Sequence, residues 1–119
     1  MKKIFSLILI IILGLMLVGC AKKNPTNSNQ TPVITSLKAE PSSIKVGESS
    51  VLTATAYDPE KENLTYQWSS VVGYFIGSGS QVKYAVPSSC CLTNDEITLT
   101  VKDSQGQESK KIIRMSIAF

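Results

Sequence analysis

The side chains of this sequence that could carry chemistry are three cysteines and a small set of carboxylates. Cys20 directly follows an apolar N-terminal run, whereas Cys90 and Cys91 are adjacent in the chain. The 119 residues include no histidine, which removes the commonest general base and the commonest metal ligand of proteins. A Ser-His-Asp site, a Cys-His site and a zinc site with histidine ligands are therefore excluded for this sequence. We expect a protein without enzymatic activity.

The N-terminal segment that positions Cys20 has the composition of a secretory signal peptide. Two lysines follow Met1, and an apolar run of fifteen residues extends from Ile4 to Val18. A basic start, an apolar stretch of this length and a small residue before a cleavage site are typical of such peptides. As a helix, a run of this length would reach about 22 Å, which is short of the ~30 Å hydrocarbon core of a membrane. We therefore expect cleavage rather than a permanent transmembrane helix.

Leu17, Val18, Gly19 and Cys20 resemble the lipobox of bacterial lipoproteins. The resemblance implies that the Cys20 thiol takes a diacylglyceryl group through a thioether. It also implies that a lipoprotein signal peptidase cuts between Gly19 and Cys20, after which the new amine can be acylated. Each buried CH₂ group contributes about 0.8 kcal/mol, so two or three acyl chains such as palmitate would hold the protein on a membrane. The alternative is an ordinary signal peptide followed by an accidental cysteine.

Residues 1–19 are thus predicted to be a signal peptide, and residues 20–31 to be the lipidated cysteine and a flexible linker. The linker contains no large apolar residue, so it cannot help to form a core. Fully extended, it would reach at most about 35–40 Å and hold a domain just off a membrane surface. These features predict a location in the bacterial cell envelope. In a cell with two membranes, Ala21 replaces the aspartate that often retains lipoproteins in the inner membrane, which favours the outer membrane.

The predicted mature chain is close to neutral. Removal of Lys2 and Lys3 with the signal peptide lowers the formal net charge of +3 by two units, and Lys22 and Lys23 lie beside the anchor. No basic stripe remains that would predict binding to nucleic acid. A chain of this length buries about two-thirds of its unfolded surface, which is enough for one core.

From Pro32 onward the sequence has the pattern of an all-β protein. Short runs rich in Val, Ile, Thr and Tyr alternate apolar and polar residues and are bounded by turn-forming residues. About seven strands at regular intervals predict one β-sandwich over residues 32–119. Trp68, the single tryptophan, is expected to be the central core residue. The expected strands are residues 33–39, 44–46, 50–57, 64–70, 81–86, 96–102 and 109–117, with a short strand at 74–76.

The order and spacing of several short segments in this region are similar to those of a known domain family. The segments are residues 33–37, 46–48, 52–59, 64–69, 79–87 and 99–106. Together they resemble a bacterial immunoglobulin-like domain of the polycystic-kidney-disease (PKD) type. Two features depart from it: the turn after Trp68 lacks the usual aspartates, and Cys90-Cys91 replaces a usual glycine and aromatic residue. The resemblance implies adhesion, spacing, or carbohydrate and protein contacts at a cell surface, without implying one ligand.

Four carboxylates lie near two of the predicted turns: Asp58, Glu60 and Glu62 near the first, and Asp103 near the second. In related cadherin-like modules, an Asp-Pro-Asp-Gly-Asp loop at this place can bind Ca²⁺, an ion that takes roughly six to eight oxygen ligands. Here the loop contains Lys61 and no glycine. Two interpretations stay open, a calcium site and an Asx-type turn beside a solvated run of charges.

With Cys20 assigned to lipid, Cys90 and Cys91 remain as an adjacent pair in an exported, oxidising compartment. Four alternatives stay open for the pair: a vicinal disulfide, two reduced thiols packed under a loop, intermolecular bridges, and a functional redox or metal pair. A vicinal ring distorts the peptide bond within it. Two sulfurs without a further ligand make a poor zinc site.

Tyr74 and Phe75 lie in residues 71–77, which are unusually apolar for a connection. This segment is either a short strand at the edge of the sandwich or an exposed contact patch for a glycan or a protein. Taken together, the sequence predicts a membrane-anchored envelope lipoprotein whose domain is a non-catalytic binding, adhesion or scaffolding module. The alternative function is an envelope redox or ligand-sensing protein that uses Cys90 and Cys91.

Overall fold

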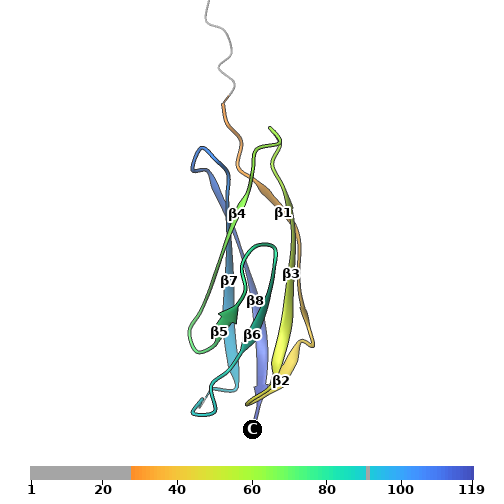
Figure 1. The fold of residues 1–119 in the computed structure, drawn as a ribbon, viewed down its shortest axis with the longest axis vertical. Helices are drawn as coiled ribbons and strands as arrows, with labels where there is room; N and C mark the ends of the chain where they lie inside the picture. Colours follow the sequence, from red (N-terminus) through yellow and green to blue (C-terminus); the bar gives the residue numbers. More distant parts are fainter. Residues whose placement is uncertain (1–27, 91) are drawn as a thin grey trace, which may run out of the picture.

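The structure, a computed structural model, describes residues 28–90 and 92–119, and within these residues the regular elements are all β-strands. No helix in this part of the chain is long and apolar enough to cross a membrane. The predicted signal peptide, the lipobox and most of the predicted linker lie outside the described residues. The described strands are β1 Val33–Glu40, β2 Ser43–Lys45, β3 Ser49–Tyr57, β4 Thr65–Ser70, β5 Tyr74–Ile76, β6 Gln81–Ala85, β7 Asn94–Lys102 and β8 Glu108–Ala118 (Figure 1).

The strands form two four-stranded sheets that pack face to face. The first sheet has the order β1-β3-β6-β5, and the second has the order β2-β8-β7-β4. Neighbouring strands are antiparallel except β2, which runs parallel to β8. The chain changes sheet between β1 and β2, directly after the cis peptide bond Glu40–Pro41. There the Ser50 hydroxyl of β3 donates a hydrogen bond to the Pro41 carbonyl at 2.6 Å.

The prediction of an all-β sandwich is confirmed, and each expected strand is present with its ends moved by at most two residues. The predicted number of about seven strands is low, because the described residues contain eight. The short segment Tyr74–Ile76 pairs with β6 along its whole length and is a full member of the first sheet.

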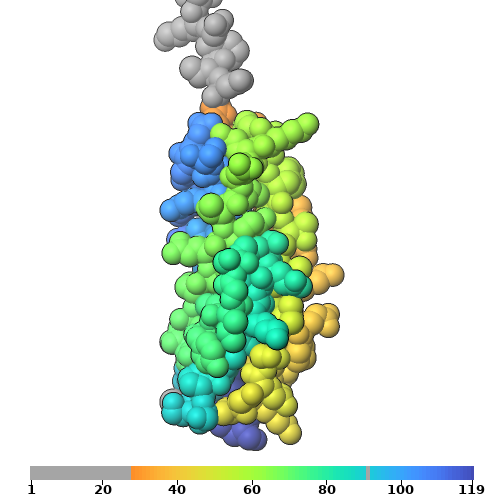
Figure 2. All heavy atoms as spheres, in the orientation of Figure 1, coloured from red at the N-terminus to blue at the C-terminus, as the bar shows by residue number. Residues whose placement is uncertain are grey.

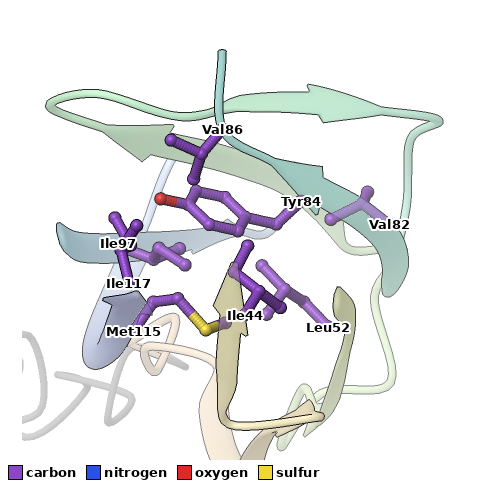
Figure 3. Close-up of a cluster of buried hydrophobic side chains, with 8 residues drawn as sticks. All are labelled: Ile44, Leu52, Val82, Tyr84, Val86, Ile97, Met115 and Ile117. Atoms are coloured by element: carbon purple, nitrogen blue, oxygen red, sulfur yellow. The ribbon is translucent and has the colours of Figure 1, made fainter. Parts of the chain in front are cut away.

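The core lies between the two sheets and receives side chains from both (Figure 3). Tyr84, on the interior strand β6, is fully buried. Trp68 does not occupy the central position that the sequence predicted for it. It lies on β4, the edge strand of the second sheet, so it is only half-buried, and its indole N–H donates to the Gly79 carbonyl at 2.9 Å. The largest buried cluster comprises Ile44, Leu52, Val82, Tyr84, Val86, Ile97, Met115 and Ile117.

A buried carboxylate connects the two sheets at the end of the sandwich away from the linker. Asp95, at the start of β7, is 2% exposed and accepts a hydrogen bond from the Tyr84 hydroxyl at 2.6 Å. It also accepts the backbone N–H groups of the turn between β4 and β5, from Val71, Val72 and Gly73, at 3.1, 3.3 and 3.0 Å. A Cβ at Gly73 would overlap the Tyr84 ring, so this turn requires glycine.

These hydrogen bonds keep Asp95 ionised. Burial acts to raise the pKa of Asp95, but the bonds from Tyr84 and the three amides outweigh it and hold the pKa below its usual value. Burial and the neighbouring carboxylate raise the pKa of Tyr84. Because the folded-state pKa of Asp95 is lowered, its contribution to stability is present above the unfolded-state pKa of about 3.9 and is lost as pH falls through the folded-state value.

We expect Tyr84→Phe to lower the free energy of unfolding by about 1–3 kcal/mol, because it leaves a buried carboxylate oxygen short of a donor. The matched control is Tyr57→Phe on β3, where the tyrosine is 54% exposed and the change should stay within about 0.5 kcal/mol. Urea unfolding at neutral pH measures both variants. Equal effects of the two substitutions would contradict the role of the Tyr84 hydroxyl.

Candidate functional site

Two loops and the linker converge at the end of the sandwich opposite the C-terminus (Figure 1). We call this region the linker end. It comprises residues 29–32 before β1, residues 58–63 between β3 and β4, and residues 103–107 between β7 and β8. Three of the four carboxylates that the sequence placed near two turns meet here.

Asp58 shapes the first of the two loops. Its Oδ1 accepts the backbone N–H groups of Glu60 at 2.8 Å and Glu62 at 3.2 Å. The Asp58 carbonyl accepts the N–H of Lys61 at 3.0 Å, and Lys61 has a left-handed φ of 58°. The predicted Asx-type turn is therefore present, and it reverses the chain so that the Glu62 carboxyl returns towards Asp58.

Asp103 shapes the second loop in the same manner. Its Oδ1 accepts the N–H groups of Gln105 and Gln107, both at 2.9 Å, while its Oδ2 accepts the side-chain amide of Asn29 at 2.7 Å. Burial acts to raise the pKa of Asp103, but the Asn29 amide and the loop N–H groups lower it below its usual value. Asp103 is consequently a carboxylate at neutral pH.

Asp58, Glu62 and Asp103 each present a carboxylate oxygen within 4.8 Å of the other two. The two aspartates are 6% and 5% exposed. Like charges this close disfavour one another unless a proton or a cation lies among them. Glu60 does not join the three, because its Oε1 instead accepts the backbone N–H of Gln30 at 3.1 Å. The predicted set of four carboxylates is thus a cluster of three.

Unpaired oxygens make the cluster a candidate for a hard cation. Among the described residues, Asp58 Oδ2, Glu62 Oε2 and Asn29 Oδ1 are buried and have no hydrogen-bond partner. Buried oxygens without a donor are costly, and one cation can satisfy several of them. Calcium takes carboxylate and amide oxygens at about 2.3–2.6 Å, so ligands of one ion lie within about 5 Å of each other. Asp58, Glu62 and Asp103, with Asn29, would hold such an ion.

Asn29 is the member of the site that the sequence did not reveal. It lies in the segment predicted to be a flexible linker, where asparagine also occurs at positions 24 and 27. Nothing in the local sequence separates Asn29 from its neighbours. Its role depends on contact with Asp103, which is far away along the chain.

The structure places Tyr74 and Phe75 on opposite faces of β5, so they do not form one patch. The Phe75 ring turns inward, with its centroid 6.2 Å from that of Trp68 and 5.7 Å from that of Tyr84. Tyr74 turns outward and is 49% exposed, and Ile76, two residues on, is 54% exposed. Neighbouring residues of a strand alternate between faces, which explains the separation. The exposed pair is therefore Tyr74 with Ile76.

A shallow depression of about 390 Å³ adjoins Ile76 on the outer face of the first sheet. Ile76 on β5 is paired with Lys83 on β6, which is paired with Val51 on β3, so the three form a row across the sheet. We call Val51, Tyr74, Ile76 and Lys83 the β5 patch. Figure 2 shows the face of the molecule on which the teal and the yellow segments lie, which include β6 and the start of β3.

Cys90 lies in the loop after β6 and is half-buried. Its sulfur lies 3.7 Å from the Leu92 carbonyl oxygen. Cys91 lies outside the described residues, so the predicted vicinal disulfide and its alternatives stay predictions. Cys20 and the lipobox residues Leu17, Val18 and Gly19 lie outside them as well.

No protein-family model matches the chain, and none of the curated proteins does. One solved structure with a similar fold is a nucleoside hydrolase-related hypothetical protein from Saccharophagus degradans that is associated with carbohydrate metabolism. The superposition has a TM-score of 0.64 at 17% sequence identity and covers 82% of this chain. The chain spans 28% of the length of that protein. At this identity the likeness supports the β-sandwich fold alone.

We expect Glu62→Gln to remove the response of stability to Ca²⁺. In chelator, the variant should be at least as stable as the unmodified protein, because one of three mutually repelling charges is gone. In Ca²⁺ at a hundredfold excess over the dissociation constant, the unmodified protein should gain about 2.7 kcal/mol and the variant much less.

The matched control is Glu60→Gln, which makes the same change of charge in the same loop but outside the cluster of three. It should keep the full gain in stability. Thermal unfolding with chelator and with millimolar Ca²⁺ measures all three proteins. If the melting temperature of the unmodified protein does not change on addition of Ca²⁺, the cation site is contradicted.

Proposed function

We propose that this protein is a bacterial envelope lipoprotein whose immunoglobulin-like, PKD-like sandwich serves as a non-catalytic binding, adhesion or scaffolding module. We include in the proposal a hard divalent cation such as Ca²⁺ at the linker end. The observation that carries the proposal is the position of the linker, which enters the sandwich at the end opposite the C-terminus (Figure 1). With a lipid on Cys20, this arrangement would present both outer faces and the far end to the surroundings.

The order of the strands supports the immunoglobulin-like assignment. Constant-type immunoglobulin domains place strands A, B, E and D in one sheet and strands C, F and G in the other. If β2 is the part of the first strand that crosses to the second sheet, β1, β3, β6 and β5 correspond to the first set. The second set corresponds to β4, β7 and β8. Trp68 on β4 then occupies strand C, where such domains carry a tryptophan.

The chemistry of the described residues favours binding over catalysis. Histidine is absent from the sequence, and the buried Asp95 is fully engaged in hydrogen bonds that hold the fold. Asp58 and Asp103 each use one oxygen to shape a loop. The oxygens that remain without a donor could accept a cation. Among the described residues, no nucleophile lies beside a general base at this site. A cation held there would supply charge neutralisation that stabilises the loops.

The β5 patch is the surface that best suits a partner. Tyr74 and Ile76 offer apolar area at the edge of the first sheet, and Lys83 adds a positive charge beside the depression. Exposed aromatic residues beside a polar rim are typical anchors of protein interfaces. A glycan or an envelope protein is the proposed kind of partner.

We expect the double substitution Tyr74→Ser and Ile76→Ser to leave the domain folded, since both side chains are about half exposed, and to weaken partner binding. Loss of an anchor of about 2 kcal/mol corresponds to roughly 30-fold weaker binding. Chemical crosslinking in intact cells, followed by recovery of the protein from membranes, measures the yield of partner adducts.

The matched control is Ile112→Ser on the outer face of the second sheet, where the isoleucine is 58% exposed. It should leave the adducts unchanged. Unchanged adducts with the double variant would contradict the β5 patch as the contact surface. Loss of adducts on Cys90→Ser with Cys91→Ser instead would favour the redox alternative.

A further inference from the structure

We infer that the cation fastens the linker to the sandwich through Asn29. This inference rests on the cation site proposed above. In the cation-bound protein, residues 29–31 are held on the domain. In the cation-free protein, they move with the linker. The divalent cation concentration outside the cell thereby sets the reach and the orientation of the module on its anchor.

The linker contacts three separate parts of the domain before β1 begins. The Asn29 side-chain amide donates to Asp103 Oδ2 at 2.7 Å, and the Gln30 N–H donates to Glu60 Oε1 at 3.1 Å. The Ser109 hydroxyl of β8 donates to the carbonyl of Pro32, which is fully buried. Asn29 and Gln30 are therefore held on the domain by polar contacts.

Asn29 is the contact that depends on a cation. Its amide nitrogen is paired with Asp103, a member of the carboxylate cluster, but its Oδ1 is buried without a donor, as are Asp58 Oδ2 and Glu62 Oε2. Without a cation, an Asn29 that leaves the site regains water at Oδ1, and its departure relieves the crowding of polar groups there. With a cation, the same oxygen gains an electrostatic partner. Movement of Asn29 away from the domain would lose this interaction.

The coupling is reciprocal by thermodynamic necessity. If a docked linker strengthens cation binding by a given factor, the cation favours the docked linker by the same factor. Removal of the Asn29 amide should weaken both the binding of the cation and the docking of the linker. Docking of three residues shortens the free part of the linker by about 10 Å, since an extended chain spans roughly 3.3–3.6 Å per residue. That change is a substantial share of the distance between the module and the membrane.

The test is heteronuclear NMR relaxation on the full chain, purified from membranes in detergent, with chelator and then with millimolar Ca²⁺. The {¹H}-¹⁵N NOE of the Gln30 amide reports the motion of the linker. We expect it to rise on addition of Ca²⁺ to the value of the β1 amides. In Asn29→Ala it should stay low, and the Ca²⁺ dissociation constant from the chemical shifts of the two loops should rise by about tenfold.

The matched control is Asn63→Ala, an exposed asparagine in the same region that takes no part in the cluster, and it should behave as the unmodified protein. If the loop resonances shift with Ca²⁺ but the Gln30 NOE does not change, the fastening is overturned and the cation site stands. The fastening is also overturned if Gln30 is already as rigid as β1 in chelator. If the loop resonances do not respond to Ca²⁺, the cation site itself is wrong, and the fastening is wrong with it.

Discussion

The buried carboxylate of Asp95 is the interaction on which the packing of the two sheets depends. It lies at the start of β7 in the second sheet and accepts a hydrogen bond from the hydroxyl of Tyr84, a residue of β6 in the first sheet. The same carboxylate fixes the turn that carries the chain from β4 to β5, and so from one sheet to the other. A buried charge is tolerated only where hydrogen bonds surround it, and Asp95 has four donors. Gly73 lies in that turn because the Tyr84 ring leaves no room for a side chain.

The linker end uses the same residue type with a different outcome. Asp58 and Asp103 each direct one oxygen to the N–H groups of their own loop, as Asp95 does towards the turn after β4. Their charges, together with that of Glu62, are then brought within 4.8 Å of one another, and oxygens remain without donors. At the end of the sandwich that contains Asp95, the buried carboxylate has its hydrogen-bond donors within the fold and stabilises it. At the other end, oxygens of Asp58, Glu62 and Asn29 have no donor among the described residues, which is the physical basis for proposing a cation there.

Local patterns in the sequence sufficed for the strands, and they failed wherever a property depends on sheet order. The alternation at Ile97, Leu99 and Val101 predicts an inward face, and all three side chains are fully buried. Trp68 shows the same alternation, yet its strand lies at the edge of its sheet, a fact that no local pattern encodes. The sequence leaves a strand and a patch of Tyr74 and Phe75 as alternatives for one segment. The segment is a strand, and it separates the two side chains because adjacent strand residues face opposite ways.

The candidate site was predictable only in part, for a related reason. The turn residues marked Asp58, Glu62 and Asp103, and the resemblance to cadherin-like modules pointed to calcium. Glu60 instead accepts the N–H of Gln30, a contact with a distant segment that no local pattern encodes. Asn29 and Asp95 were not predicted, because the partners that define them lie far away in the chain.

The proposed anchor at Cys20 gives the linker its role, since the reach of a linker matters only if its other end is fixed. The most direct measurement is the intact mass and N-terminal sequence of the protein isolated from membranes. We predict a chain that starts at Cys20 and carries a diacylglyceryl thioether, with or without an acylated amine. A chain that starts at Met1, or a mature chain with an unmodified Cys20, would contradict the account.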